Sequence, residues 1–391
     1  PIRINPGVNR GYLKNTLVNE GADKHKLKNF TAASGNVVYR GDNFPDKFYG
    51  MSVTPEPAGN LISARKIIES ETSISGEEIY PEQEILASTD ERFRPVNLYT
   101  APDGTLYIVD MYHGILQHRV FVTEYLKDQI LSRDLDKHNN TMGRIYRLRW
   151  QENKAGQQPN LQDLSAQQLV QYLAHPNGWW RDTARRLIVE SADKSVSNAI
   201  ITLIENTHDH RAIINALWTL DGLDNISISA VKAALNFNQT KAEHKKVVVS
   251  AIAVSEKLPL ADHKEMAEIL KQNAKANYQI ALQVALSAGA IKDSQALVAL
   301  AMVLDSFPDK AYIQDAVISG LAGREVEFLA LLGKSKHMQF QTALAKVGDK
   351  TIIVDGRAQL STKDKKRFDL GKKLYHSEAA CFGCHGPKGE G

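Results

Sequence analysis

Cysteine is nearly missing from this sequence, with two residues among 391, and no run of 18 apolar residues occurs. The second absence excludes a membrane-spanning helix. The formal net charge is only +3, which is too small to indicate nucleic acid as a partner. No signal peptide is visible, but the first residue is Pro1 rather than Met, so we expect a piece of a longer protein and infer nothing from the missing leader.

Both cysteines belong to one pentapeptide near the end of the sequence, Cys381-Phe382-Gly383-Cys384-His385. CxxCH is the attachment motif of c-type haem. Each thiol can add to one vinyl group of the haem, and the two-residue gap sets the sulfurs at the spacing of the two vinyls. His385 is then the proximal ligand of the iron. The motif therefore predicts covalent haem on Cys381 and Cys384, with His385 on the metal.

Two other interpretations of the pentapeptide stay open. A structural zinc site usually needs four ligands in two pairs, and this sequence has no second CxxC and no HxxxH. A redox-active dithiol usually lies early in a βαβ unit, not after a charged helix. Haem attachment is the interpretation that the context favours.

The segment before the motif, residues 364–376, is predicted to be a charged helix with Gly371 in its middle. Together with the tail GPKGEG, it resembles the start of a class I cytochrome c, in which a glycine lets another helix cross closely. The resemblance implies a distal methionine ligand, but all six methionines precede Cys381. We therefore expect the distal ligand beyond Gly391, and a poorly packed, haem-free motif in this piece.

Residues 1–150 have the pattern of a sheet protein. β-rich runs are predicted at 37–39, 48–54, 61–68, 105–109 and 144–149. Turn formers such as Pro102-Asp103-Gly104 separate them, and one helix is predicted over 122–133. Short strands at this spacing fit the blades of a β-propeller.

Three stretches of this region carry a family resemblance: NVVYRGDNFPDKFYGMSVTPEPAGNLISARKI, ASTDERFRPVNLYTAPDGTLYIVDMYHG and GRIYRLRW. In this order they resemble the last blades of the glucose/sorbosone dehydrogenase propellers, which use pyrroloquinoline quinone (PQQ). The whole chain resembles multidomain proteins of Planctomycetes, Verrucomicrobia and Bacteroidetes that join such a propeller to helical repeats and a cytochrome c domain. The resemblance implies that the catalytic histidine and the calcium ligands lie on blades before Pro1.

The resemblance also implies a role for Arg92 and Arg94. In the quinoprotein dehydrogenases an RxR segment at this place binds the PQQ carboxylates, which guanidinium groups match bidentately. The alternative is that both arginines bond loop carbonyls at the end of a blade. The family further uses a lysine in the turn of the preceding blade, whereas residues 56–60 contain none. PQQ and calcium are thus cofactors that we expect only of the full-length parent.

Residues 163–348 change to a period of 3.6 residues. Helices are predicted at 164–174, 179–191, 194–206, 209–221, 227–237, 241–256, 261–273, 276–288, 292–305, 310–321 and 324–333. Similar residue pairs, such as Ala216-Leu217 and Ala251-Ile252, recur about every 30–35 residues, which predicts paired helices stacked as HEAT-like repeats. Trp179 and Trp180 are expected to seal the first repeat against the sheet region, with ligand stacking as the alternative.

The predicted fold is therefore multidomain: last blades of a β-propeller at 1–150, an α-solenoid of HEAT-like repeats at 163–348, and the start of an α-helical cytochrome c domain at 362–391. The predicted function is electron transfer through haem c to a redox partner or downstream cytochrome, in an oxidoreductase whose parent oxidises a sugar or alcohol at a propeller-bound quinone. The alternative is a non-catalytic binding module for polysaccharide or protein, wired to a cytochrome domain. Because haem is attached outside the bacterial cytoplasm, we expect a periplasmic or outer-surface location.

Overall fold

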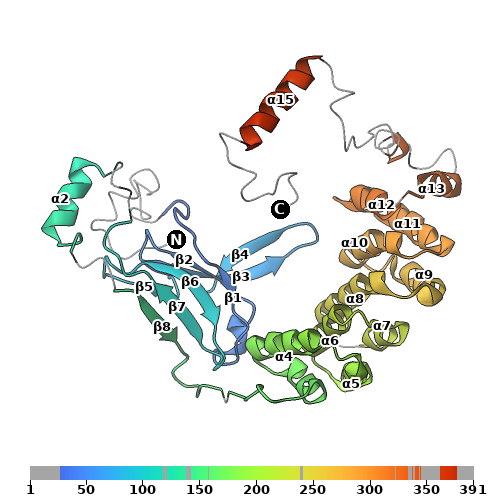
Figure 1. The fold of residues 1–391 in the computed structure, drawn as a ribbon, viewed down its shortest axis with the longest axis horizontal. Coiled ribbons are helices and arrows are strands. Elements are labelled where there is room, and N and C mark those ends of the chain that lie inside the picture. The colour runs from blue at the N-terminus through green and yellow to red at the C-terminus, as the bar shows by residue number, and fades with distance from the viewer. Residues whose placement is uncertain are drawn as a thin grey trace. The chain divides into compact units, whose positions relative to one another are not determined.

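The computed structural model divides the chain into two compact units, Pro1–Arg324 and Glu325–Gly391 (Figure 1). The structure describes residues 27–116, 118, 120, 122–137, 142–156, 158–237, 241–321, 323–332, 337, 340–342, 344 and 362–376. Over these ranges a sheet-rich N-terminal region precedes a helical C-terminal region. None of the helices in them combines the length and the hydrophobicity that crossing a bilayer requires.

The N-terminal region contains two antiparallel sheets. Their strands are β1 Val37–Val38, β2 Ser52–Glu56, β3 Leu61–Glu69, β4 Ile74–Glu78, β5 Leu86–Ala87, β6 Pro95–Thr100, β7 Leu106–Asp110 and β8 Arg144–Leu148. The first sheet has the order β1-β2-β3-β4, and β5 pairs with the beginning of β3; the second has the order β6-β7-β8. Gly35, just before β1, forms an isolated parallel bridge to Asn97 of β6.

One hydrophobic cluster draws side chains from both sheets, including Val53 and Ile62 from the first and Leu98 and Ile108 from the second. Strand β7 alternates between buried and half-buried residues, the period-two pattern of a strand with one face in the core. Each fully buried aliphatic or aromatic side chain contributes about 1.5–3 kcal/mol. The shared cluster therefore holds the two sheets together as one body.

The predicted strand runs miss β4, β5 and β6. All residues of β4 are exposed, so the sequence there has no alternation to detect. Strand β6 begins at a proline, and its pairing with β7 shifts register between Pro95 and Asn97, which interrupts its pattern. The other predicted runs coincide with or overlap β1, β2, β3, β7 and β8.

Helix α2 Glu124–Ser132 belongs to the sheet region, at the predicted place. The helical region of the first unit consists of α3 Ala166–Leu169, α4 Gly178–Ser191, α5 Ser197–Asn206, α6 His210–Gly222, α7 Ile228–Leu235, α8 Lys241–Val254, α9 His263–Asn273, α10 Tyr278–Ser287, α11 Ser294–Ser306 and α12 Ile313–Leu321. Several begin after an Asn, Asp or Ser whose side chain accepts a hydrogen bond from the first turn, for example Asn177 before α4 and Asp209 before α6. Each helix predicted in this region is confirmed to within a few residues, in places as an α-helix preceded or followed by a 3-10 turn.

These helices pack as a linear series, in which α4, α6, α8, α10 and α12 contact one another in turn, while α5 contacts α7 and α9 contacts α11. The recurring alanines Ala216, Ala251 and Ala285 are fully buried, which lets the neighbouring helices approach. At Gly320 of α12 the approach to α10 leaves no room for a side chain, because a Cβ atom would lie 2.2 Å from the carbonyl oxygen of Ala285.

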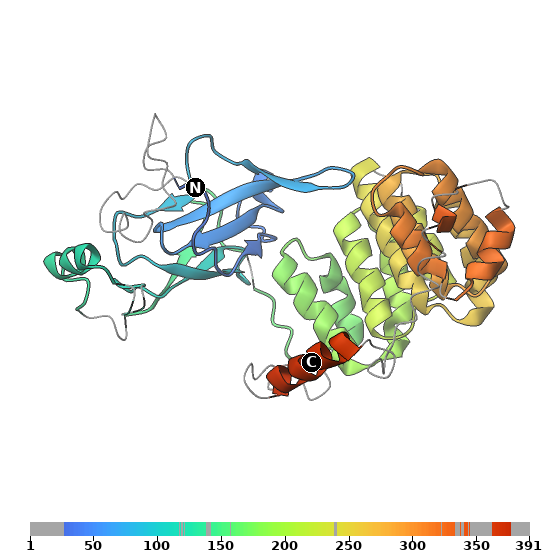
Figure 2. The same cartoon turned by 90° about the horizontal axis from the view of Figure 1, so that it is seen from above.

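The ribbon formed by β3 and β4 reaches these helices (Figure 2). At its tip, the main-chain oxygen of Ser70 accepts a hydrogen bond from Gln279 Nε2 at 3.2 Å, and Glu71 forms an ion pair with Lys310. The sheet region and the helices of the first unit are therefore in contact at points far apart in the sequence.

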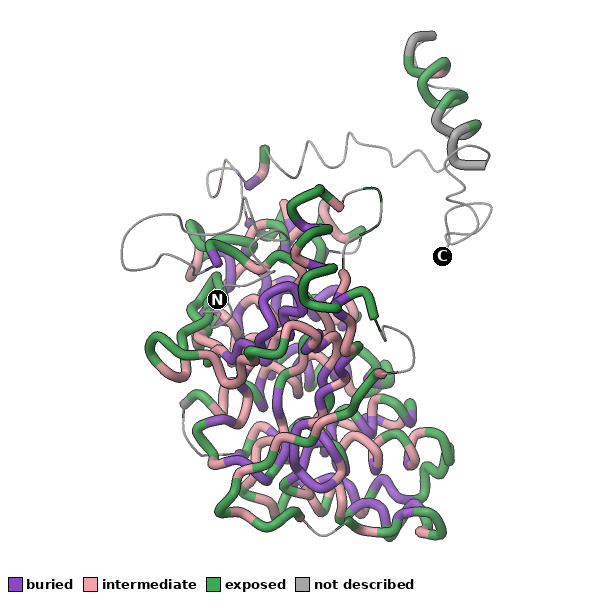
Figure 3. Tube along the Cα trace, turned by 90° about the vertical axis from the view of Figure 1, so that its left-hand side faces the viewer, coloured by how far each residue is buried: buried purple, intermediate pink, exposed green. Residues whose placement is uncertain are grey.

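The second unit contains α13 Glu325–Leu332 and α15 Thr362–His376. Phe328 packs against Phe340 edge to face, with ring centroids 6.0 Å apart. The described side chains of α15 are mostly exposed, as the green colouring in Figure 3 shows.

Candidate functional site

Arg94 lies in the interior of the sheet region, with an exposed fraction of 0%. Its guanidinium group donates to main-chain carbonyls: Nη1 to Pro57 at 2.8 Å, Nε to His113 at 3.0 Å and Nη2 to Gly114 at 3.3 Å. Carbonyl oxygens of this kind satisfy a buried guanidinium group and allow the interior to hold it. Arg94 therefore ties the loop at Pro57 to the loop at residues 113–114.

Arg92 is half-buried and also bonds the main chain, because its Nη2 donates to the carbonyl oxygen of Asp134 at 2.6 Å. Its own N–H donates to Asp90 Oδ1 at 2.9 Å. Both predicted PQQ ligands thus have loop carbonyls as partners, the arrangement that the sequence leaves as the alternative to cofactor binding.

Asp110, at the end of β7, bonds the main chain of Arg94 and of the segment that leads to residues 113–114. Its Oδ1 accepts hydrogen bonds from the N–H of Arg94 at 2.7 Å and of Tyr112 at 2.8 Å, and Tyr112 has a left-handed φ of 47°. Burial raises the pKa of Asp110, and these two hydrogen bonds oppose the rise.

His113 is hydrogen-bonded through Nδ1 to the carbonyl oxygen of Ile115. Across the described ranges, no three His, Cys, Asp or Glu side chains are grouped to hold a metal ion.

The predicted haem residues Cys381, Cys384 and His385 lie outside the described residues. The helix before them is described, and α15 confirms the helix predicted at 364–376. Phe368 and Leu370 on this helix are 47% and 58% exposed. Exposed apolar side chains on a charged helix provide a surface that another element can cover.

The structure brings a further set of residues together where α4 meets the sheets. Asn177 is fully buried, and its Nδ2 donates to the carbonyl oxygens of Ala101 at 2.9 Å and Pro102 at 3.1 Å. Its Oδ1 accepts from the N–H of Trp179 at 3.0 Å and so caps the helix. Trp180 Nε1 donates to the same Pro102 oxygen at 2.8 Å. We call this contact region the sheet–helix junction.

The start of α4 also contacts the chain just after β1. The N–H of Gly178 donates to the carbonyl oxygen of Arg40 at 2.7 Å, and a Cβ on Gly178 would lie only 2.8 Å from the Cβ of Arg40. Glycine is therefore the residue that allows this approach. The Arg40 guanidinium group then forms a two-point ion pair with Asp182, one turn along α4.

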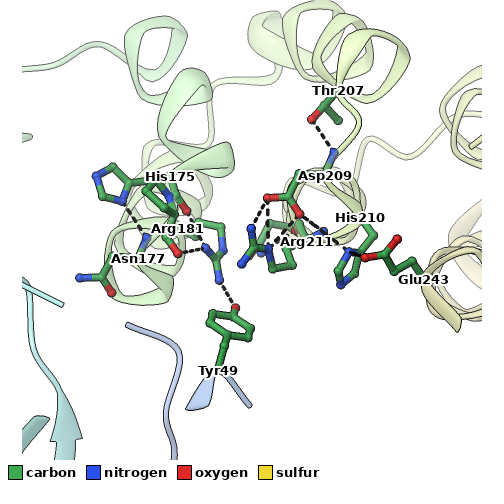
Figure 4. Close-up of polar contacts among 11 residues, drawn as sticks. Tyr49, His175, Asn177, Arg181, Thr207, Asp209, His210, Arg211 and Glu243 are labelled. Carbon is green, nitrogen blue, oxygen red and sulfur yellow. Dashed lines mark hydrogen bonds and ion pairs between the residues drawn. The ribbon is translucent and has the colours of Figure 1, made fainter. Parts of the chain in front are cut away.

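Arg181 is the most buried cation of the junction, with an exposed fraction of 1%. Figure 4 shows its contact with Tyr49. Its Nη1 donates to the carbonyl oxygens of His175 at 2.5 Å and Pro176 at 2.7 Å, and its Nη2 donates to Tyr49 Oη at 2.6 Å. No acceptor among the residues that the structure describes lies within reach of its Nε. Burial lowers the pKa of the Arg181 guanidinium group.

A second guanidinium group approaches Tyr49 from α6, because Arg211 lies 4.9 Å from the centre of its ring. Arg211 is held by a bidentate pair with Asp209, with Nη2 and Oδ2 at 2.9 Å. Beside it, His210 Nδ1 lies 3.4 Å from Glu243 Oε1, and burial lowers the pKa of His210. Tyr49 thus links the sheet region to two successive helices of the series.

A cavity of about 280 Å³ opens at the junction. Tyr99 and Thr100 of β6 lie on its sheet side, and Trp179 and Asp182 of α4 lie on its helix side. Of these residues the sequence singles out only Trp179. The others come from separate segments with no shared motif, so only the folded contacts identify them as neighbours.

Residues 7–152 match the model of a family described as a domain of unknown function (DUF7133). The match ends close after β8, so the boundary of the family agrees with the end of the sheet-rich region. No curated protein and no solved structure matches the chain.

Proposed function

We propose that the chain is part of an extracytoplasmic electron-transfer protein. In this proposal haem c is held covalently by Cys381 and Cys384, and the sheet and helical regions form a non-catalytic body for binding. The CxxCH pentapeptide carries the proposal. Two thiols and an adjacent imidazole are the donor set that c-type haem requires. When bound, the haem supplies one-electron transfer, and His385 would hold its iron.

Helix α15 supports this assignment. In a class I cytochrome the first helix leads into the haem motif, and its apolar side is covered by another helix. The exposed side chain of Phe368 is apolar surface that such a partner would cover.

The same proposal includes the finer architecture. The two antiparallel sheets are compatible with the last blades of a β-propeller. The successive contacts among α4, α6, α8, α10 and α12 are compatible with HEAT-like repeats.

The non-catalytic role of the sheet region rests on Arg94. A ligand of a PQQ carboxylate needs accessible N–H groups, and the Arg94 side chain is fully buried against carbonyl oxygens. The turn at 56–60, where the resembling dehydrogenases use a lysine, is anchored instead by the buried Glu56, which accepts a hydrogen bond from the N–H of Thr31 at 2.8 Å. Arg94 and Glu56 therefore do not fit PQQ, and we assign no PQQ to this part of the chain.

The test of the haem assignment uses the full-length protein that contains this chain, produced in a host that matures c-type cytochromes. We expect haem that stays bound after denaturing electrophoresis and gives a c-type pyridine haemochrome spectrum. Changing both cysteines, Cys381→Ala with Cys384→Ala, should abolish it, whereas His376→Ala, outside the motif, should not. Purified wild-type protein without covalent haem would contradict the proposal.

The test of the non-catalytic role is separate. We expect PQQ with calcium to leave the Tm of the full-length protein that contains this chain unchanged, in wild type and in Arg92→Ala alike. A rise in Tm that disappears in Arg92→Ala would restore the quinone interpretation.

A further inference from the structure

The cavity at the sheet–helix junction has two exposed aromatic rings. Trp179 of α4 is 37% exposed and Tyr99 of β6 is 54% exposed, whereas the neighbouring Trp180 is 7% exposed. Exposed aromatic surface is unfavourable in water, and its concentration around a hollow marks a binding site more often than scattered exposure does. Both rings come from rigid elements, one from a helix and one from a strand.

Neighbouring groups hold both rings in place before any ligand arrives. Trp179 packs edge to face against Trp180, with ring centroids 4.5 Å apart, and Trp180 is itself fixed by its bond to Pro102. The hydroxyl of Tyr99 accepts a hydrogen bond from Asn97 Nδ2 at 2.8 Å. A ligand that stacks here would therefore lose little affinity to ordering of the site.

The charged residues that line the cavity are Arg40 and Asp182, which form an ion pair and are 42% and 35% exposed, and Arg186, whose Nη1 lies 3.7 Å from Glu190 Oε1 one turn further along α4. A paired guanidinium and carboxylate together present both donors and acceptors to a ligand while their charges cancel. This combination suits hydroxyl groups, which donate and accept at the same time. It suits a free anion poorly, because Asp182 pairs with Arg40 and Glu190 pairs with Arg186.

The geometry points to a neutral saccharide as the ligand. A pyranose ring has an apolar C–H face that can stack on Trp179, with Tyr99 as the second contact, and an edge of hydroxyl groups that the Arg40–Asp182 pair can bond. At about 280 Å³, the cavity lies just below the usual range of about 300–1,000 Å³ for small-molecule pockets, so it suits one sugar ring of a longer glycan. This site is independent of the haem motif and of any quinone.

The experiment is a titration of the purified chain with cellopentaose, maltopentaose and xylopentaose, and with tri-galacturonate as the charged comparator. Tryptophan fluorescence and saturation-transfer NMR report binding. We expect saturable binding of at least one neutral sugar, with transfer to its C–H protons. Binding of tri-galacturonate alone, or of none of the four, would overturn the proposal.

The chain offers matched controls for both aromatic residues. Trp179→Ala should weaken binding by roughly tenfold or more, whereas Trp218→Ala should leave it unchanged, although Trp218 is 39% exposed on α6. If Trp179→Ala fails to fold, Tyr99→Ala replaces it, with the 53% exposed Tyr125 of α2 as its control. Equal effects of a cavity variant and its control would count against the site.

Discussion

The indole N–H of Trp180 donates to the carbonyl oxygen of Pro102, 2.8 Å away, and so joins the first long helix of the series to the turn between β6 and β7. Asn177 donates to the same oxygen at 3.1 Å. One main-chain carbonyl of the sheet region thus receives two side-chain donors from the start of α4. This shared acceptor makes the junction a specific contact, because both donors must reach the same oxygen.

The first prediction concerns Asn177. Its change to alanine removes a helix cap and two hydrogen bonds from a fully buried site, so we expect the free energy of unfolding to fall by about 2–4 kcal/mol. The control is Asn198→Ala, an exposed residue in the first turn of α5, which should change stability by less than about 0.5 kcal/mol. Urea unfolding measures both. Equal losses in the two variants would show that the junction adds nothing to stability.

The second prediction concerns pH. Burial lowers the pKa of His175, and Arg181 adds to this effect while Asp42 opposes it. In addition, its Nδ1 accepts a hydrogen bond from the N–H of Asn177 at 3.0 Å, which requires the unprotonated nitrogen. The unfolded chain, with a pKa of about 6.5, therefore binds more protons than the native protein below that pH. The stabilisation by neutral His175 is complete above about pH 6.5 and is lost as the pH falls through the lowered pKa.

The measurement for His175 is unfolding in urea at pH 7.5 and pH 5.5. We expect wild type to lose more stability over this interval than His175→Asn, whose amide oxygen can replace Nδ1 as acceptor without titrating. His210, whose pKa is also lowered by burial, contributes in the same direction and is unchanged in both proteins, so it cancels from the comparison. An identical pH dependence in the two proteins would show that His175 titrates normally.

Much of this fold follows from periodicity in the sequence. Every helix from α3 to α13 was predictable because each buries one face against its neighbours, which leaves a 3.6-residue pattern. Strand β4 could not be predicted in this way because its residues are all exposed and it is held by main-chain pairing with β3 and by one ion pair, between Arg65 and Glu78. Main-chain hydrogen bonds place few demands on the side chains, so they leave no pattern to detect.

The candidate sites were less predictable. From the sequence Arg92-Phe93-Arg94 alone, either arginine could bind a ligand. The fold distinguishes them, because it buries Arg94 completely and leaves Arg92 half-buried. Whether a guanidinium group meets solvent or loop carbonyls depends on residues 57 and 113–114, which are distant in the chain. The cavity between Tyr99 and Trp179 depends in the same way on contacts between elements that no local pattern reports.

The third prediction separates these two arginines. Arg94→Met leaves the carbonyl oxygens of Pro57, His113 and Gly114 buried without their donor, so we expect a loss of about 3–5 kcal/mol. Arg92→Met makes the same substitution at a half-buried position, so we expect it to lower the free energy of unfolding by less than about 1 kcal/mol. Thermal unfolding followed by circular dichroism ranks the two variants. A smaller effect at Arg94 than at Arg92 would contradict the structural role that we give to Arg94.

The last prediction concerns the packing of the helical series. At Gly320 an added Cβ would meet the carbonyl oxygen of Ala285 at 2.2 Å, a distance that only a shift of α12 away from α10 can relieve. We therefore expect Gly320→Ala to destabilise the protein by about 1–3 kcal/mol, although alanine is by itself the better helix former. The matched control is Gly143→Ala, whose Cβ would have its nearest neighbour, the Asp110 oxygen, at 3.7 Å, an ordinary contact. Because alanine also restricts the unfolded chain, Gly143→Ala should be neutral or slightly stabilising. Chemical denaturation measures the free energy of unfolding of both variants. An unchanged free energy in Gly320→Ala would mean that α10 and α12 do not approach as closely as the structure shows.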